Sequence, residues 1–266
     1  MSAEIIGLHP WFDTPSGRHL LAWEQDRFDE AVADIFGYHG LQLGLPGCQA
    51  LRANRMPHRW LAVEDPAAVA AAGAQLAIDF AALPFGPASL DLVVLPHTLE
   101  FSADPHTTLR EVERVLVPEG KVVISGINPA SLWGPRERRA RLWRRLGAPA
   151  QPYLPQSGGS IGYWRLRDWL GLLSFEVESA RFGCYAPAVR SARWIERFGW
   201  MEGLGSRSWP IFGAGYFIVA TKRVQGLRLM EPGWKTAAAA ALAPAAVPAV
   251  NRGRRETLTQ RTPCGR

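Results

Sequence analysis

The stretch around residues 83–125 constrains the fold of this chain more than any other. A continuous apolar run from Leu90 to Leu95 is typical of a strand that helices cover on both faces. The next helix is predicted to begin at Asp104-Pro105, because an Asp carboxylate accepts orphan backbone N–H groups and Pro fits the first helical position. A Pro-Glu-Gly turn ends this helix, and a second strand follows from Lys121 to Ser125. A strand, a helix and a strand joined by short connections predict a parallel βαβ unit.

The same stretch carries a recognisable series of residues. They are Leu83-Pro84-Phe85, Ser89-Leu90-Asp91-Leu92-Val93, His97, Leu99-Glu100, Leu109-Arg110-Glu111-Val112, Arg114-Val115-Leu116, Pro118 and Gly120. This series resembles the central half of class I S-adenosylmethionine-dependent methyltransferases, specifically the type 11 methyltransferase-like group. The resemblance spans residues 40–222 with varying quality. It implies an α/β fold with a Rossmann-like, seven-stranded, mostly parallel sheet, helices on both faces, an antiparallel last strand and a helical cap.

The chain is expected to contain one domain and a tail. Residues 1–224 form the methyltransferase-like domain, with an N-terminal helix at 16–36 and a variable cap insertion at 126–160. Residues 225–266 are expected to be a disordered, basic, Ala- and Pro-rich tail, because such a composition cannot close a core. Most of the chain's net charge of +6 lies in this tail, so the charge argues only weakly for nucleic-acid binding by the domain.

Hydrophobic periodicity and turn residues predict the remaining elements. Gly37 and Gly40 are expected to end the N-terminal helix, which Thr14-Pro15-Ser16 begins. The predicted strands outside the βαβ unit span residues 41–44, 60–63, 76–79, 176–181 and 215–221, and a further helix spans 163–173.

In the resembling family, a glycine-rich loop after the first strand approaches the methionine part of the cofactor S-adenosylmethionine. The usual pattern has an acidic residue and three alternating glycines. This chain offers Gln42, keeps only Gly44 and Gly47, and carries Pro46, which lacks a backbone donor. The loop is therefore degenerate, and a purely structural turn is the alternative, since any tight corner uses glycine.

Two acidic positions are expected to bind the rest of the cofactor. Glu64 or Asp65 follows the second strand about 20 residues beyond Gly44, where a carboxylate commonly binds ribose hydroxyls. Asp79 ends the third strand and matches the family position whose side chain approaches the adenine amino group. A loop or helix-cap role for the first carboxylate and a turn-initiating role for Asp79 are the alternatives.

Leu95 and His97 come at the carboxyl end of the fourth strand, the edge at which such sheets bind ligands, and both are expected to contact the cofactor. His97 is also a candidate for a catalytic base, because the pKa of histidine lies near neutrality. Family members often have polar residues here without an acid–base role. Glu100 is another candidate, but Phe101 replaces a histidine that is common in the family pattern.

The resemblance implies an S-adenosylmethionine-dependent methyltransferase that acts on a small or amphipathic acceptor held beneath the cap. The alternative is a catalytically inactive, methyltransferase-like binding or scaffold protein, which the degenerate loop favours. Catalytic signatures do not separate these two, because methyl transfer mainly needs an oriented nucleophile and exclusion of water.

An arginine-rich segment from Arg136 to Arg145, with Trp133 and Trp143 beside it, lies in the expected cap. It could bind RNA or an anionic membrane through charge and aromatic stacking. The favoured alternative is a solvated helix whose arginines pair with acidic neighbours.

Cysteine and histidine usage excludes several classes of protein. Cys48, Cys184 and Cys264 are odd in number and far apart, so a disulfide framework is not expected. The six histidines are dispersed, so no metal site is expected. No apolar run approaches the ~20 residues of a membrane span, and the N-terminus does not resemble a signal peptide. A cytoplasmic location is therefore expected.

Overall fold

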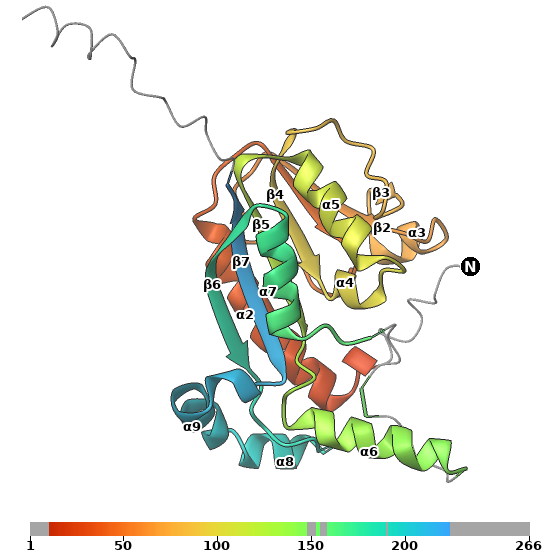
Figure 1. Ribbon diagram of the computed structural model, residues 1–266, viewed down its shortest axis with the longest axis vertical. Coiled ribbons are helices and arrows are strands. Elements are labelled where there is room, and N and C mark those ends of the chain that lie inside the picture. Colours follow the sequence, from red (N-terminus) through yellow and green to blue (C-terminus); the bar gives the residue numbers. More distant parts are fainter. Residues whose placement is uncertain (1–10, 148–152, 155–158, 190, 224–266) are drawn as a thin grey trace, which may run out of the picture. The chain divides into compact units, whose positions relative to one another are not determined.

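The computed structural model describes residues 11–147, 153–154, 159–189 and 191–223 (Figure 1). Contacts within the chain separate Met1–Val224 from Gln225–Arg266, and every element below belongs to the first of these units. The predicted disordered tail and part of the predicted cap insertion lie outside the described residues. The predicted domain boundaries therefore stay predictions.

Seven strands form one sheet in the order β3-β2-β1-β4-β5-β7-β6. They are β1 (His39–Leu43), β2 (His58–Val63), β3 (Leu76–Ala77), β4 (Leu90–Pro96), β5 (Leu116–Ile127), β6 (Phe175–Gly183) and β7 (Gly215–Lys222). The pairs among β1 to β5 are parallel, whereas β7 runs antiparallel to both β5 and β6. The predicted sheet and its antiparallel last strand are confirmed.

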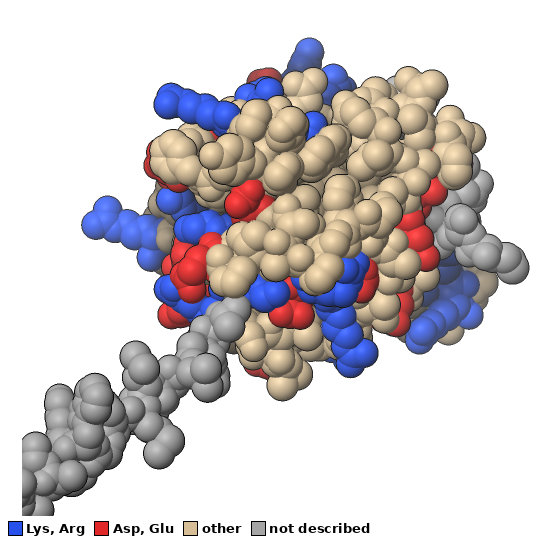
Figure 2. Space-filling model, turned by 90° about the horizontal axis from the view of Figure 1, so that it is seen from above, with Lys and Arg blue, Asp and Glu red and all other residues tan. Residues whose placement is uncertain are grey.

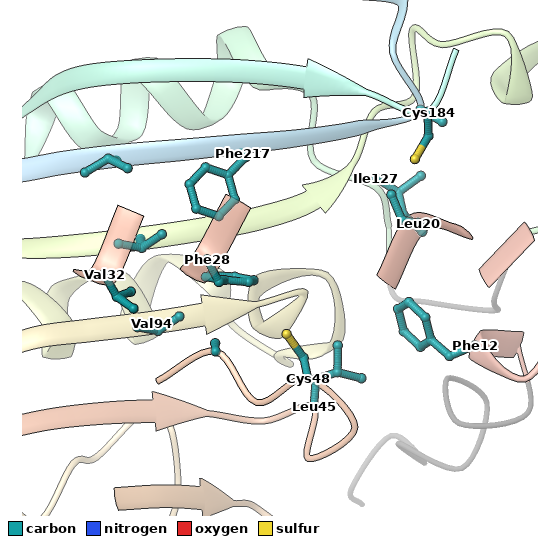
Figure 3. Packing of buried hydrophobic residues seen from close by; sticks show 14 of the residues in the cluster. Phe12, Leu20, Phe28, Val32, Leu45, Cys48, Val94, Ile127, Cys184 and Phe217 are labelled. Carbon is teal, nitrogen blue, oxygen red and sulfur yellow. The ribbon is translucent and has the colours of Figure 1, made fainter. Parts of the chain in front are cut away.

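The sheet has a hydrophobic core on each face, because successive side chains of a strand point to opposite sides. Val94 of β4 packs in the cluster that α2 (Pro15–Ala33) covers, while its neighbour Val93 packs in the cluster of α5 (Pro105–Val115) and α7 (Tyr163–Leu172). Figure 3 shows the first cluster, in which the ring of Phe28 from α2 lies against Phe217 of β7, with 4.9 Å between their centroids.

The N-terminal helix begins as predicted and ends earlier. The Thr14 side chain accepts a hydrogen bond from the N–H of Gly17 and caps α2. The helix ends at Ala33 rather than at Gly37, and Phe36 is 78% exposed. The predicted end of this helix was wrong because Phe36, which was counted as part of its apolar face, does not pack against the sheet.

The βαβ unit follows the prediction with one local difference. Asp104 caps α5 by accepting hydrogen bonds from the N–H groups of His106 and Thr107. The chain then enters β5 at Leu116 rather than at Lys121, since Leu116 is already extended and pairs with Leu90. The predicted turn is an irregularity within β5, because the pairing resumes only at Lys121.

The remaining helices are short, apart from one. They are α3 (Ala68–Ala72), α4 (Thr98–Phe101), α6 (Trp133–Arg145), α8 (Ala192–Arg197), α9 (Trp200–Ser208) and the 3₁₀ turn η2 (Pro210–Phe212). In Figure 1, α6, α8 and α9 lie at the end of the domain to which the arrowhead of β6 points. We call these three helices and η2 the cap. The helices of the cap that lie between β6 and β7, α8, α9 and η2, were not predicted. Their large apolar side chains are exposed, so they do not form the buried, regularly spaced face by which a helix is recognised in a sequence.

The opposite end of the sheet has mixed charges. Figure 2 shows it from above, with basic and acidic side chains interspersed around a largely uncharged surface. Arg223 there contacts the carboxylates of Glu119 and Glu176, and Lys121 lies 2.6 Å from Glu178. Exposed pairs of this kind contribute little to stability, and among the described residues they balance the basic side chains Arg223 and Lys121 with carboxylates.

Candidate functional site

The turn after β1 is built around the buried side chain of Gln42. Its amide nitrogen donates to the carbonyls of Gly44 at 3.2 Å, Leu45 at 3.1 Å and Cys48 at 2.6 Å. Its amide oxygen accepts from the N–H of Ala50 at 3.0 Å. One side chain therefore satisfies the backbone of a tight loop that no regular helix follows.

The two glycines of this loop have different surroundings. Gly44 has a φ of +74°, a left-handed conformation that glycine adopts without strain. A Cβ placed on Gly44 would lie 3.6 Å from the hydroxyl of Thr98, the first residue of α4. A Cβ on Gly47 would meet no atom within 4 Å. The loop is thus packed at its beginning and open at Gly47.

Glu64 and Asp79 lie close together at the carboxyl ends of β2 and β3. Partial burial and then the neighbouring Asp79 carboxylate raise the pKa of Glu64, whereas a hydrogen bond from the N–H of Phe80 opposes this rise. Asp79 is exposed, and one of its oxygens accepts from the N–H of Ala81 at 2.8 Å. Two carboxylates at neighbouring strand ends can accept hydrogen bonds from hydroxyl and amino groups of a ligand.

A buried charged network lies at the end of β4. His97 Nδ1 is 2.9 Å from the carboxylate of Glu100, and His97 Nε2 is 3.0 Å from the carboxylate of Glu24 on α2. All three side chains are buried, and the second oxygen of Glu100 accepts from the N–H of Ile127 at 2.6 Å. The network therefore ties α2 to the strand ends of the central sheet.

The charges of this network are coupled. Burial alone would lower the pKa of the His97 imidazole, but the two carboxylates outweigh it and raise the pKa to about 10. Burial raises the pKa of Glu100, although His97 opposes the rise. At neutral pH the imidazole thus carries both protons, and each of them is donated to a carboxylate.

Aromatic side chains from the N-terminal segment cover the network. The ring of Phe12 lies 5.3 Å from that of His97, and the ring of Trp11 packs edge-on against both Phe12 and Trp133 of α6. Figure 3 shows Phe12 near the end of α2 that carries Leu20. These contacts exclude water from His97 and join the segment directly before α2 to the cap.

Comparison with known proteins agrees with this architecture. Residues 47–124 match the protein family described as a methyltransferase domain. YafS of Escherichia coli K12, an uncharacterized protein, is 31% identical over 231 residues, which are 85% of each chain. The chain belongs to the class I S-adenosylmethionine-dependent methyltransferase family.

Two solved structures of this methyltransferase family share the fold. A methyltransferase from Thermotoga maritima is 16% identical and matches with a TM-score of 0.51 over 80% of this chain and 93% of its own. A second, from Archaeoglobus fulgidus, is 17% identical and matches with a TM-score of 0.52 over 76% of this chain and 94% of its own.

Some residues predicted to bind the methyltransferase cofactor meet at one edge of the sheet. Gly44, Glu64 and Asp79 all follow parallel strands that are neighbours in the sheet, and Gly47 lies in the same loop as Gly44. The carboxylate pair and the open position at Gly47 fit the hydroxyl groups and the amine of S-adenosylmethionine. The loop carbonyls of Gly44, Leu45 and Cys48 are already occupied by the Gln42 amide, so the fit rests on the two carboxylates and on the open space at Gly47.

The other predicted residues lie inside the protein. The side chain of Leu95 is fully buried in the core shared with α5, and His97 is 1% exposed with both ring nitrogens engaged. Their contact with the cofactor, and the catalytic role of His97, stay predictions.

Sequence reasoning missed Glu24 and the function of Gln42. A signal for Glu24 does exist, because Leu20, Glu24 and Phe28 follow one another at helical spacing and all are 0% exposed. A carboxylate within an apolar stripe indicates a buried ion pair. Gln42 gives no comparable signal, because its partners are backbone groups.

Proposed function

We propose that this protein transfers a methyl group from S-adenosylmethionine to a small or amphipathic acceptor in the cytoplasm. The observation that carries the proposal is the proximity of Glu64 and Asp79 at the ends of β2 and β3, beside the open Gly47 turn. In the resembling family these positions contact the ribose and the adenine. The two described cysteines are free thiols, which suits a reducing compartment.

In this proposal each residue at the edge has a separate role. Glu64 accepts hydrogen bonds from the ribose hydroxyls, and Asp79 faces the adenine amino group. Gly44 and Gly47 allow the backbone to approach the methionine part. When bound, the cofactor supplies a methyl group on a sulfonium that is already activated for displacement. The protein has to hold the acceptor in line and exclude water.

We assign His97 a positioning role. A doubly protonated imidazole has no lone pair to accept a proton from an acceptor, so His97 in this arrangement is no general base at neutral pH. Its bonds to Glu24 and Glu100 instead fix α2 beside the end of β4.

Calorimetry of the full chain with S-adenosylmethionine and S-adenosylhomocysteine tests the proposal. We expect both ligands to bind, Glu64→Gln to weaken binding, and Glu176→Gln, the same change at an exposed carboxylate of β6, to leave it unchanged. No detectable heat at millimolar ligand would refute the cofactor site. Binding without methyl incorporation into any acceptor pool would favour the alternative, an inactive binding or scaffold protein.

The cap supports a second role, which is docking on an anionic membrane surface. No helix among the described residues is long and apolar enough to cross a bilayer. Large apolar side chains are nevertheless exposed throughout the cap: Leu142, Trp143, Leu146, Trp194, Trp200, Leu204, Trp209, Ile211 and Phe212. Several of them line an apolar cavity of about 430 Å³ that also includes Leu132 and Met201. Exposed Trp with flanking Arg is typical of proteins that lie at a membrane interface.

Charge favours an anionic bilayer as the partner. On α6, Arg141 pairs with Glu137 at 3.0 Å, but Arg138, Arg144 and Arg145 have no ion pair among the residues that the structure describes. The sequence-based alternative, in which these arginines pair with acidic neighbours, therefore holds for Arg141. The exposed apolar side chains favour a membrane over RNA, because acyl chains offer them an apolar environment and a phosphate backbone does not.

Vesicle co-sedimentation tests the docking. We expect the protein to bind phosphatidylglycerol vesicles more tightly than phosphatidylcholine vesicles, and Trp200→Ala with Trp209→Ala to weaken this binding. Trp164→Ala is the matched control, because Trp164 is 56% exposed but belongs to α7. Equal binding to both vesicle types, or tighter binding to RNA, would refute the membrane surface.

A further inference from the structure

Three side chains of types that commonly bind metal ions meet where the cap contacts α2 and the end of β6. His19 lies on α2, Cys184 directly follows β6, and Glu202 lies on α9. A ring nitrogen, the thiol sulfur and a carboxylate oxygen of these residues all lie within 4.8 Å of one another. The ring nitrogen and the carboxylate oxygen are 3.5 Å apart. The sequence predicted no metal site because the six histidines are dispersed, whereas His19 and Glu202 are 183 positions apart and meet only in the folded protein.

The carboxylate of this cluster is held in place by the backbone. One oxygen of Glu202 accepts from the N–H of Cys184 at 3.1 Å, and the other accepts from the N–H of Tyr185 at 2.8 Å. A carboxylate oxygen has two lone pairs: Oε2 keeps one free, and Oε1 directs its second toward His19 Nε2 at 3.5 Å. Hydrogen bonds from outside a metal site orient its ligands in the same way.

One side of the cluster is buried and the other is accessible to solvent. Cys184 is 1% exposed, whereas the side chains of His19 and Glu202 are each 32% exposed. These two line a cavity of about 640 Å³ together with Asp26, Tyr185 and other residues. A cation between the three side chains would therefore keep one coordination position open to the cavity.

We propose that His19, Cys184 and Glu202 bind a divalent transition-metal ion of the Zn²⁺ class, with a fourth ligand supplied by water from the cavity. A sulfur, a nitrogen and an oxygen donor suit Zn²⁺ or Co²⁺, whereas Mg²⁺ and Ca²⁺ prefer oxygen alone. The ion joins α9 of the cap to the helix that carries Glu24. This proposal does not depend on methyl transfer.

Titration of the metal-free, full-length protein with Co²⁺ tests the site. We expect one Co²⁺ per chain, with the visible bands of a four-coordinate ion and a thiolate-to-cobalt charge-transfer band, all of which Zn²⁺ removes. Cys184→Ser should abolish the charge-transfer band. Cys48→Ser should keep it, because Cys48 is the other buried cysteine among the described residues and Figure 3 shows it well separated from Cys184.

A second measurement does not depend on the fold of the cysteine variants. His19 is partly exposed, so His19→Ala should fold, and its Zn²⁺ affinity, measured against a chromophoric chelator, should fall at least about tenfold. An unsaturable titration, a charge-transfer band that survives Cys184→Ser or disappears in Cys48→Ser, or an unchanged affinity of His19→Ala would each overturn the proposal.

Discussion

Glu24 and His97 are 73 positions apart in the chain, and their side chains meet in the interior with 3.0 Å between carboxylate and ring nitrogen. Both side chains are fully buried. Because the ring of His97 also contacts Glu100, a single imidazole joins the N-terminal helix to the end of the central strand.

Glu24→Gln should lower the free energy of unfolding by about 3 kcal/mol, because it leaves a buried cation with one anionic partner fewer. Urea denaturation at neutral pH measures this. Glu30→Gln on the same helix is the control, since Glu30 is half exposed and pairs with Arg27 and Arg181 at 2.8 Å. The control should change stability by less than about 1 kcal/mol. Similar losses in the two variants would contradict a buried ion pair.

Stability should fall as the pH rises from 6.5 towards 10. The pKa of His97 is raised from 6.5 to about 10, so above pH 6.5 the folded protein holds a proton that the unfolded chain has lost. The stabilisation is complete below pH 6.5 and is lost through this window, with a slope of at most about 1.4 kcal/mol per pH unit. The raised pKa of Glu100 has the same sign, but its contribution begins to be lost at the lower pH where the unfolded carboxyl group ionises. Denaturation curves across the window should show this slope, and His97→Gln should flatten it.

Gln42→Glu should destabilise the protein by about 2 kcal/mol, although it brings back an acidic residue near the glycines. A carboxylate cannot donate to the carbonyls of Gly44, Leu45 and Cys48, which the Gln42 amide now satisfies. Gln75→Glu is the matched control, because the exposed Gln75 accepts from the N–H of Leu61 and keeps that acceptor. Thermal denaturation compares the two, and a Gln42→Glu variant as stable as the parent would show that the amide does not hold the loop.

Gly44→Ala and Gly47→Ala should separate folding from cofactor binding. The φ of +74° at Gly44 predicts a loss of about 1 kcal/mol of stability on substitution. Gly47→Ala should leave stability within about 0.5 kcal/mol of the parent, because its added methyl group meets no atom. The same methyl group should weaken S-adenosylhomocysteine binding about tenfold if the loop faces the cofactor. Calorimetry reads this, and unchanged affinity would place the cofactor elsewhere.

The sequence predicts those parts of the fold whose signals are local. Asp104 and Thr14 are capping residues directly before apolar stripes, so the start of α5 could be predicted to the residue and that of α2 to within one residue. Glu64 and Asp79 could be predicted as neighbours because parallel strands end at the same edge. The short helices α8 and α9 could not, since their tryptophans are exposed and leave no buried periodicity.

The side-chain networks were less accessible to sequence reasoning. His97 was recognised as a residue at a strand end, but its burial depends on Glu24 and Phe12, which come from distant segments. His19, Cys184 and Glu202 likewise meet only after the cap has packed on α2. Contacts of this kind depend on tertiary packing, which spacing along the chain does not encode.

The position of β7 has a consequence for how the chain is made. This strand is the last of the described elements to leave the ribosome, yet it lies between β5 and β6 and every residue in it is buried. Until it emerges, the growing polypeptide exposes two unpaired strand edges and a half-covered apolar surface. The sheet therefore cannot be completed until residues 215–222 have been synthesised, and a nascent chain that stops before residue 215 lacks the strand that joins β5 to β6.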